Sequence, residues 1–145
     1  MYIVRVSEYP HSTFVILDAG PCIVADSSIV RIIDRLASFY QPKASNASQV
    51  KGYKYRLGDY AIRIGIATIG QSVKGVLIEI EALPFVDPSI CWKSLTEFIG
   101  RLVDGSLVLP AVAPVPRSSD KQYSPLDTAM QYVSVFDEMR SAKTV

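Results

Sequence analysis

Two glutamates, two positions apart, are the strongest candidates in this chain for a metal-binding or catalytic role. Glu79 and Glu81 lie in a segment of alternating apolar and polar residues, so on one strand face they would sit about 6–7 Å apart. Two such carboxylates can share a metal ion, as in barrel enzymes that hydrolyse triphosphates. Those enzymes also need Lys and Arg on the same surface, whereas Leu77 and Leu83 flank this pair. The alternative is a solvated or partner-facing strand face, and the flanking leucines favour it.

The other nucleophiles and metal ligands lack the neighbours that would activate them. His11 is the only histidine, and no Cys, Asp or Glu lies at the spacing of a metal site or a catalytic triad, which predicts an exposed loop residue. Cys22 and Cys91 are the only cysteines. Without a secretory signal we expect two buried free thiols and no disulfide. The sequence therefore predicts no enzymatic activity, no cofactor and no metal.

Length and charge limit the class of protein. With 145 residues, of which 49% are apolar and 20% charged, the chain can bury one core, so residues 1–145 are expected to form a single domain. Fifteen Lys and Arg against fourteen Asp and Glu give a net charge of +1, which is too little for sequence-independent binding to phosphates. No apolar stretch is long enough to span a membrane. We expect neither direct binding of nucleic acid nor association with a membrane.

The elements that must position these residues follow from periodicity. Six segments of apolar character, separated by turns or polar loops, are expected as strands, and the last three as antiparallel neighbours with one buried face each. The expected strands are residues 2–7, 13–18, 22–25, 53–57, 62–66 and 76–81. An amphipathic helix is expected from Ile29 to Tyr40, followed by a polar loop at residues 41–48.

Two further helices are expected in the second half of the chain. Asp87 and Pro88 are typical of a helix start, and Gly105 is typical of a helix end. Ser124, Pro125 and Asp127 resemble a capping box at the start of the final helix. This order of elements predicts an α+β fold, a mostly antiparallel sheet with about three flanking helices.

A proline-punctuated apolar segment between the last two helices is the first candidate for a partner interface. It can be neither a helix nor a full sheet strand, and such segments can lie across a partner's groove or along its sheet edge. Its residues are Leu107, Val108, Leu109, Pro110, Val112, Pro114 and Val115. The alternative is a surface crossover on the chain's own domain. Trp92, which lies off the apolar stripe of its helix, is the second candidate, with packing against the sheet as its alternative.

Five blocks of residues also carry a family resemblance. They are Ser7 to Pro10, Gly20 to Asp26, Tyr60 to Glu81, Cys91 with Trp92, and Asp127 to Tyr132. In this order they resemble subunit 20 of the Mediator transcription coactivator complex, over nearly the whole chain except the loops at residues 41–48 and 104–121. Their joint occurrence is far more specific than any single block.

The resemblance implies a fold, a location and partners. It implies a barrel-like antiparallel sheet, a place in the Mediator head module in the nucleus, a heterodimer with Mediator subunit 18, and an indirect link to RNA polymerase II without enzymatic activity. Contact with the TATA-binding protein is also associated with the family, although no residue here marks that surface. Family members carry an N-terminal segment before the position of Tyr2, which this chain is expected to lack.

A second interpretation, from another class of protein, is a longin-like trafficking adaptor. A five-stranded sheet sandwiched by helices has a similar order of elements and also needs no catalytic residue. This interpretation depends on topology alone. The partner that co-purifies with the chain would distinguish the two.

Overall fold

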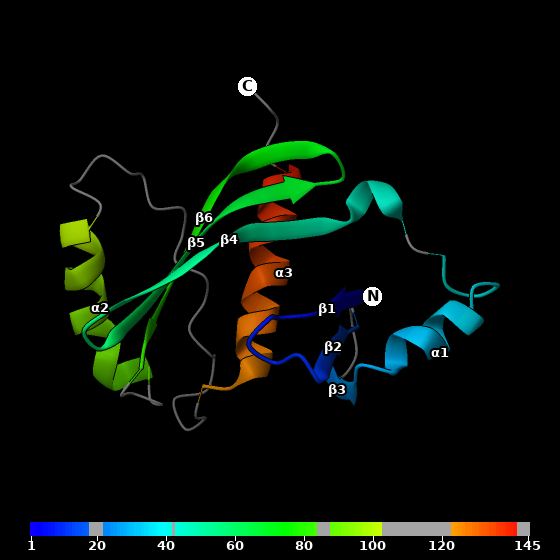
Figure 1. Cartoon of the computed structure of the whole chain (residues 1–145), viewed down its shortest axis with the longest axis horizontal. Coiled ribbons are helices and arrows are strands. Elements are labelled where there is room, and N and C mark those ends of the chain that lie inside the picture. The colour runs from blue at the N-terminus through cyan, green and yellow to red at the C-terminus, as the bar shows by residue number, and fades with distance from the viewer. Residues whose placement is uncertain (18–21, 42, 84–87, 103–122, 142–145) are drawn as a thin grey trace. The chain divides into compact units, whose positions relative to one another are not determined.

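The structure, a computed structural model, describes residues 1–17, 22–41, 43–83, 88–102 and 123–141. Contacts divide the chain into two units, residues 1–47 with 124–145 and residues 48–123. The elements are β1 (Tyr2–Val4), β2 (Ser12–Ile16), β3 (Cys22–Asp26), α1 (Ile29–Arg35), β4 (Ser48–Leu57), β5 (Tyr60–Ile69), β6 (Ser72–Ala82), α2 (Pro88–Leu102) and α3 (Pro125–Ser141), with a short 3-10 turn at Ala44–Asn46 (Figure 1).

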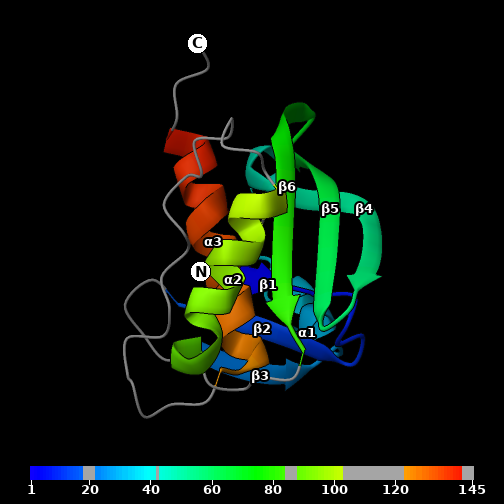
Figure 2. The ribbon, with the colours of Figure 1, turned by 90° about the vertical axis from the view of Figure 1, so that its left-hand side faces the viewer.

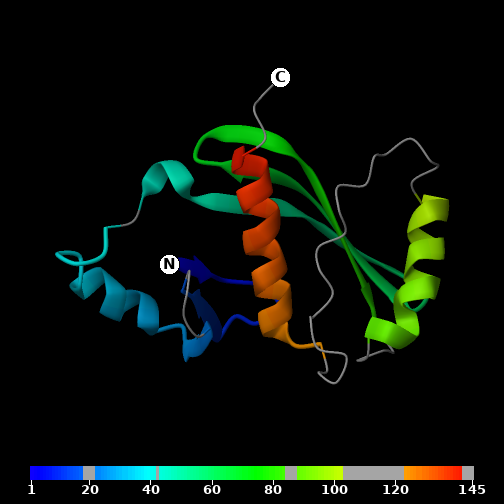
Figure 3. The same cartoon turned by 180° about the vertical axis from the view of Figure 1, so that it is seen from behind.

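The first unit is an antiparallel sheet in the order β1-β2-β3 with α3 against it (Figure 3). In the central strand, Phe14 and Ile16 share one face and form a buried cluster with Ala129 of α3. Leu126 and Val133, three and four positions away on that helix, pack against the same cluster. A helix from the far end of the chain therefore covers this sheet face, and its 3.6-residue period supplies the matching apolar stripe.

Polar contacts hold both ends of α3. At its start, the carboxylate of Asp127 accepts hydrogen bonds from the backbone N–H of Ser124 at 2.8 Å and from its hydroxyl at 2.6 Å, which confirms the predicted cap. Near its end, Asp137 accepts a hydrogen bond from the Tyr2 hydroxyl at 3.0 Å and forms an ion pair with Arg140. Strand β1 and α3 are thus joined by side chains as well as by packing.

Helix α1 is shorter than the sequence predicts. It ends at Arg35 instead of near Tyr40, and none of its residues is buried. The carboxylate of Asp26 accepts a hydrogen bond from the backbone N–H of Ser28 at 2.9 Å, just before the helix. The apolar period of this segment marks which residues share a face, but within the described part of its unit nothing covers that face enough to bury a residue.

The second unit contains a longer antiparallel sheet in the order β4-β5-β6 (Figure 2). Gly58 and Asp59 form the two-residue turn between β4 and β5, with Leu57 opposite Tyr60. Gly58 has a φ of 58°, a conformation that such hairpin turns require and that glycine adopts without strain. The hairpin predicted at this position is confirmed.

Two glycines face each other across the middle of β4 and β5. Gly52 is the register partner of Gly65, and the strands approach so closely there that a Cβ on Gly52 would lie 1.9 Å from the carbonyl oxygen of Ile64. Only a residue without a side chain fits that approach, which lets the hairpin bend and twist strongly at this point.

The predicted α+β class, the antiparallel sheets and three helices are confirmed. The predicted barrel is wrong for the described residues, because the six strands form two separate three-stranded sheets and neither closes on itself. Strand β4 begins at Ser48, inside the predicted loop, because the hairpin register extends beyond the alternating residues 53–57. That residues 1–145 form a single domain stays a prediction.

Candidate functional site

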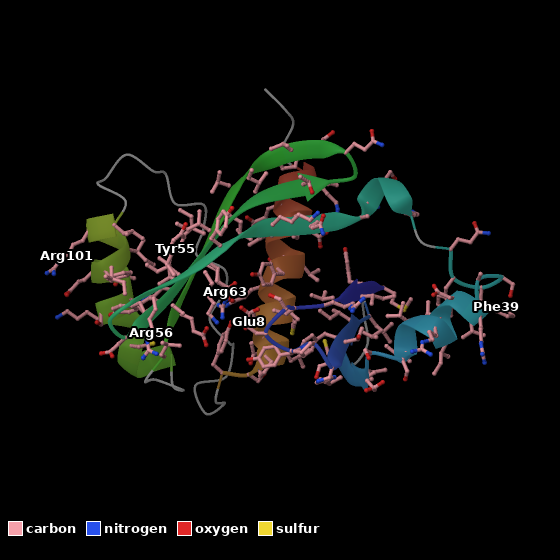
Figure 4. The ribbon with its side chains drawn as sticks, in the orientation of Figure 1. Glu8, Phe39, Tyr55, Arg56, Arg63 and Arg101 are labelled. Carbon is pink, nitrogen blue, oxygen red and sulfur yellow. The ribbon has the colours of Figure 1, made fainter. Side chains whose placement is uncertain are left out.

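The two glutamates that could bind a metal are held by an arginine. Glu79 and Glu81 lie on the same face of β6, as predicted, and Arg63 of β5 lies on that face too, opposite Glu79. One Arg63 guanidinium nitrogen lies 2.7 Å from Glu79 and the other 2.9 Å from Glu81; Figure 4 labels Arg63. The guanidinium therefore bridges the two carboxylates, with one charge-assisted hydrogen bond to each.

This arrangement gives the glutamates a structural role. Within the described ranges, no three His, Cys, Asp or Glu residues gather in a way that could hold a metal ion. Arg63 lies between two carboxylates on a partly buried surface, where the pairs fix the register of β5 against β6. The geometry indicates that Arg63 joins β5 to β6 through ion pairs, and it gives no support for triphosphate hydrolysis.

The opposite face of the same sheet is apolar and largely open. Every second residue on the three strands faces this side, and the apolar residues in its part remote from the β4–β5 turn include Tyr53, Ile64, Ile66, Val76 and Ile78. All five are exposed, with 76% of Tyr53, 53% of Ile66 and 62% of Val76 accessible to solvent. We call these five residues the open sheet face.

Helix α2 covers the other part of that apolar side. The rings of Tyr60 and Phe98 stack at 4.1 Å, and the Tyr60 hydroxyl lies 2.8 Å from the hydroxyl of Ser94. Ile62, two positions along β5 on the same side, is only 5% exposed. On β5 this apolar surface is therefore buried near the turn and left open beyond it, whereas on β4 Tyr55 and Leu57 are exposed even beside the turn.

The expectation that the alternating isoleucines form the buried face of β5 is confirmed for Ile62 and wrong for Ile64 and Ile66, which are exposed. The buried face of β5 is the side of Arg63, with Ala61, Ala67 and Ile69. Contiguous exposed apolar side chains like those of the open sheet face cost solvation free energy and are typical of protein interaction sites. One apolar row crosses all three strands, Tyr53 with Ile64 and Ile78, and in the next row Ile66 and Val76 are joined by Lys51 of β4. The arrangement can dock a protein surface and has no group placed for catalysis.

The predicted interface residues are only partly described. Trp92 is partly buried on α2, so its ring neither lies fully in a core nor fully in solvent. Leu107, Val108, Leu109, Pro110, Val112, Pro114 and Val115 lie outside the described residues. Their part in an interface stays a prediction.

The histidine and cysteine predictions agree with the structure in most respects. His11 is exposed in a turn, as predicted. Both cysteines are free thiols, with Cys91 buried and Cys22 only partly buried. The part of the chain that the structure describes contains no helix of the length and hydropathy needed to cross a membrane.

Sequence reasoning missed Arg63 and the open sheet face. Counting outward from the turn between β5 and β6 would pair Arg63 with Ile78, and a register shift between Ala67 and Thr68 brings it opposite Glu79 instead, so no reliable signal for this contact was present in the sequence. The open sheet face had no such signal either, because alternation shows which residues share a side and not what covers that side.

Comparisons with known proteins agree along the whole chain. A family model described as "TATA-binding related factor (TRF) of subunit 20 of Mediator complex" matches residues 1–137.

Proteins named "Mediator of RNA polymerase II transcription subunit 20" are similar to the chain. That of Xenopus laevis is 33% identical over 141 residues, which cover 97% of this chain and 66% of that protein. The Homo sapiens protein is 33% identical over 145 residues, covering 100% and 68%. The Anopheles gambiae protein is 31% identical over 152 residues, covering 97% and 70%. The chain spans about two thirds of the length of these relatives.

Proposed function

The chain belongs to the Mediator subunit 20 family, and from this premise we propose that it is a non-catalytic subunit of the Mediator head module. As a Mediator subunit it belongs to a complex that acts in transcription regulation. We propose that it works in the nucleus as a coactivator component, docking on a larger subunit and helping to link transcription regulators to RNA polymerase II. The proposed mechanism is assembly, without a reaction, a cofactor or a metal.

The open sheet face is the observation that supports a docking role. Its five apolar side chains are exposed across three strands, and a partner that covers them would gain about 25 cal/mol for each Å² of apolar surface removed from water. Tyr53 is a residue type enriched among interface anchors, since its ring buries a large area at little cost in side-chain entropy. We propose this face as the main contact with the partner.

Mediator subunit 18 is the partner that we propose, as a heterodimer with this chain. The family resemblance implies it, and an apolar face on one sheet suits a stable subunit better than a transient encounter. Trp92 and residues 107–115 remain proposed as secondary contacts. The TATA-binding protein is proposed as a further contact of the assembled complex, and direct binding of nucleic acid or a membrane is not.

The two other functions considered have less support. Family membership favours a Mediator subunit over a longin-like trafficking adaptor, which is supported only by the order of the helices and strands. The ion pairs of Arg63 with Glu79 and Glu81 leave no described observation that favours a metal-dependent triphosphate hydrolase.

Co-expression with Mediator subunit 18 of the same organism tests the proposal. We expect a one-to-one complex in size-exclusion chromatography, with a melting temperature above that of the chain alone, because a ligand that binds only the folded state stabilises it. A well-folded chain that elutes separately from a well-folded subunit 18 would overturn the proposed heterodimer. Co-purification with membrane-trafficking subunits instead would favour the adaptor.

A further inference from the structure

Strand β4 forms an open edge of its sheet. Among the described strands its only hydrogen-bonded neighbour is β5, and all seven residues from Lys51 to Leu57 are exposed. The strand is ten residues long and contains no proline, so no backbone donor is missing along it. A long edge of this kind is a template on which another strand can pair.

The hairpin turn determines which backbone groups of β4 point outward. In a two-residue hairpin the closing pair, here Leu57 and Tyr60, exchanges hydrogen bonds, and bonded and non-bonded pairs then alternate. Gln49 therefore has its carbonyl toward β5, which agrees with the hydrogen bond that it accepts from the Thr68 hydroxyl at 3.4 Å. The backbone N–H and C=O groups of residues 50, 52, 54 and 56 point away from β5.

The two sides of this edge differ in chemistry. Lys54 and Arg56 lie on one side of the sheet, whereas Tyr53, Tyr55 and Leu57 lie on the side of the open sheet face (Figure 4 labels Tyr55 and Arg56). Strand β4 carries two lysines and one arginine and no acidic residue. Lys51 lies on the side of Tyr53, as the register partner of Ile66. An added strand would thus meet Lys54 and Arg56 on one side and, beyond Lys51, aromatic or aliphatic groups on the other.

Charges on the cationic side are balanced between β6 and β5 but not between β5 and β4. Glu79 and Glu81 on β6 are bound by Arg63 on β5. Across β5 from the basic residues of β4, Lys54 has Arg63 as its register partner and Arg56 has Ala61. Opposite charges on directly facing residues stabilise a sheet, and like charges destabilise it. Acidic residues on a further strand would face the basic row of Lys54 and Arg56 and offset its charge.

Two other occupants fit this edge less well. A second copy of the chain, paired antiparallel through β4, would place one basic row against the other. Single-stranded nucleic acid needs aromatic rings and cations on one surface so that bases stack while phosphates are neutralised. Here Tyr53 and Tyr55 share their side of the strand with Lys51 alone, and the other two cations, Lys54 and Arg56, lie on the opposite side.

We propose that β4 binds an extended segment of a protein partner as an added strand, and that this segment alternates acidic with apolar residues. Its acidic side chains face Lys54 and Arg56, and its apolar ones extend the surface of the open sheet face beyond Tyr53 and Tyr55. Backbone hydrogen bonds to residues 50, 52, 54 and 56 supply affinity, and the alternation supplies register and orientation. The proposal deepens the docking role proposed above and rests on it for the identity of the partner as a protein.

A designed peptide tests the edge independently of any Mediator subunit. The probe is an acetylated, amidated nine-residue peptide with Glu at every second position and Val or Thr between, titrated into the ¹⁵N-labelled 145-residue chain. We expect amide shifts centred on residues 50, 52, 54 and 56. Binding should weaken with added salt, and it should weaken at least tenfold when Lys replaces each Glu of the peptide or when its strand-facing amides are methylated.

Matched variants of the chain make the test specific. The double variant Lys54→Glu with Arg56→Glu should lose at least tenfold in affinity for the acidic peptide and gain affinity for the lysine peptide. Lys93→Glu with Arg101→Glu, at two exposed positions of α2, makes the same charge change and should bind the acidic peptide within twofold of the unmodified chain. Lys54→Pro, which removes one outward N–H, should also abolish binding.

Several results would overturn the proposal. These are the absence of β4 shifts at several millimolar acidic peptide, equal binding of the lysine peptide, and shifts produced by a ten-nucleotide oligothymidylate but not by the peptide. If the chain forms a complex with subunit 18 while the peptide does not bind, the added strand is wrong and the docking role stands. If the peptide binds but no complex with subunit 18 forms, the proposed partner is wrong and the edge site stands.

Discussion

The two sheets of this chain are built alike but are covered differently. Both are three-stranded and antiparallel, with sequence neighbours as strand neighbours. The β1–β3 sheet buries Phe14 and Ile16 against α3, whereas the β4–β6 sheet buries Ile62 near α2 and leaves Tyr53, Ile66 and Val76 exposed. The first sheet thus uses its apolar face for its own core, and the second leaves apolar residues exposed, which we propose that a partner covers.

The largest expected effect on stability is in the covered sheet. Phe14, which is 2% exposed, lies in the cluster with Ala129, so Phe14→Ala should lower the free energy of unfolding by about 3–5 kcal/mol. Ile66→Ala, on the open sheet face, should change it by less than about 0.5 kcal/mol. Urea unfolding followed by circular dichroism measures both. Equal losses would mean that the two faces are equally buried and would break the comparison.

The close approach within the second sheet predicts the next effect. Gly52→Ala should destabilise the chain by about 1–3 kcal/mol, because the new Cβ would meet the Ile64 carbonyl oxygen at 1.9 Å. Gly100→Ala is the matched control, since nothing lies within 4 Å of a Cβ there and alanine favours a helix over glycine by about 1 kcal/mol. Thermal melts should shift in opposite directions. If Gly52→Ala leaves the melting temperature unchanged, the close approach of β4 and β5 at this position is wrong.

A buried hydroxyl in the first sheet gives a smaller effect of opposite sign. Thr13 is fully buried, and its Oγ1 has no hydrogen-bond partner within the described residues. Thr13→Val keeps the shape and removes an uncompensated polar group, so the free energy of unfolding should rise by about 1 kcal/mol. A loss of similar size in urea unfolding would show that the hydroxyl has a partner.

The smallest effect concerns pH and the start of α1. Hydrogen bonds from the backbone and the hydroxyl of Ser28 hold the pKa of Asp26 below its ordinary value of 3.8. Because the folded pKa is the lower one, the carboxylate stabilises the fold at pH values above 3.8, and this contribution is lost as the pH falls through the folded pKa. An NMR titration should give a pKa below 3.8, and the stability difference from Asp26→Asn should shrink below that pH. A pKa at or above 3.8 would show that the hydrogen bonds from Ser28 do not stabilise the Asp26 carboxylate.

The features predicted correctly from the sequence are those that depend on residues close together in the chain. Alternation located β5 and β6 and placed Glu79 and Glu81 on one face, and the Ser124 cap was recognised because its chemistry lies within four residues. Coverage of a face depends on residues distant in the sequence. The same periodicity therefore described the buried face of Phe14 and the exposed face of Ile66 equally, and it extended α1 beyond Arg35. The ion pairs of Arg63 required a register, which composition and periodicity do not specify.

One comparison of variants tests the central claim most directly: the affinity for Mediator subunit 18 of chains that carry Ile66→Glu or Phe39→Glu. Both residues are exposed, at 53% and 80%, and both variants should fold, but only Ile66 lies on the open sheet face. The account predicts that Ile66→Glu weakens the complex at least a hundredfold in isothermal titration calorimetry and that Phe39→Glu changes it less than threefold. A complex that survives Ile66→Glu unchanged and is lost with Phe39→Glu would contradict it.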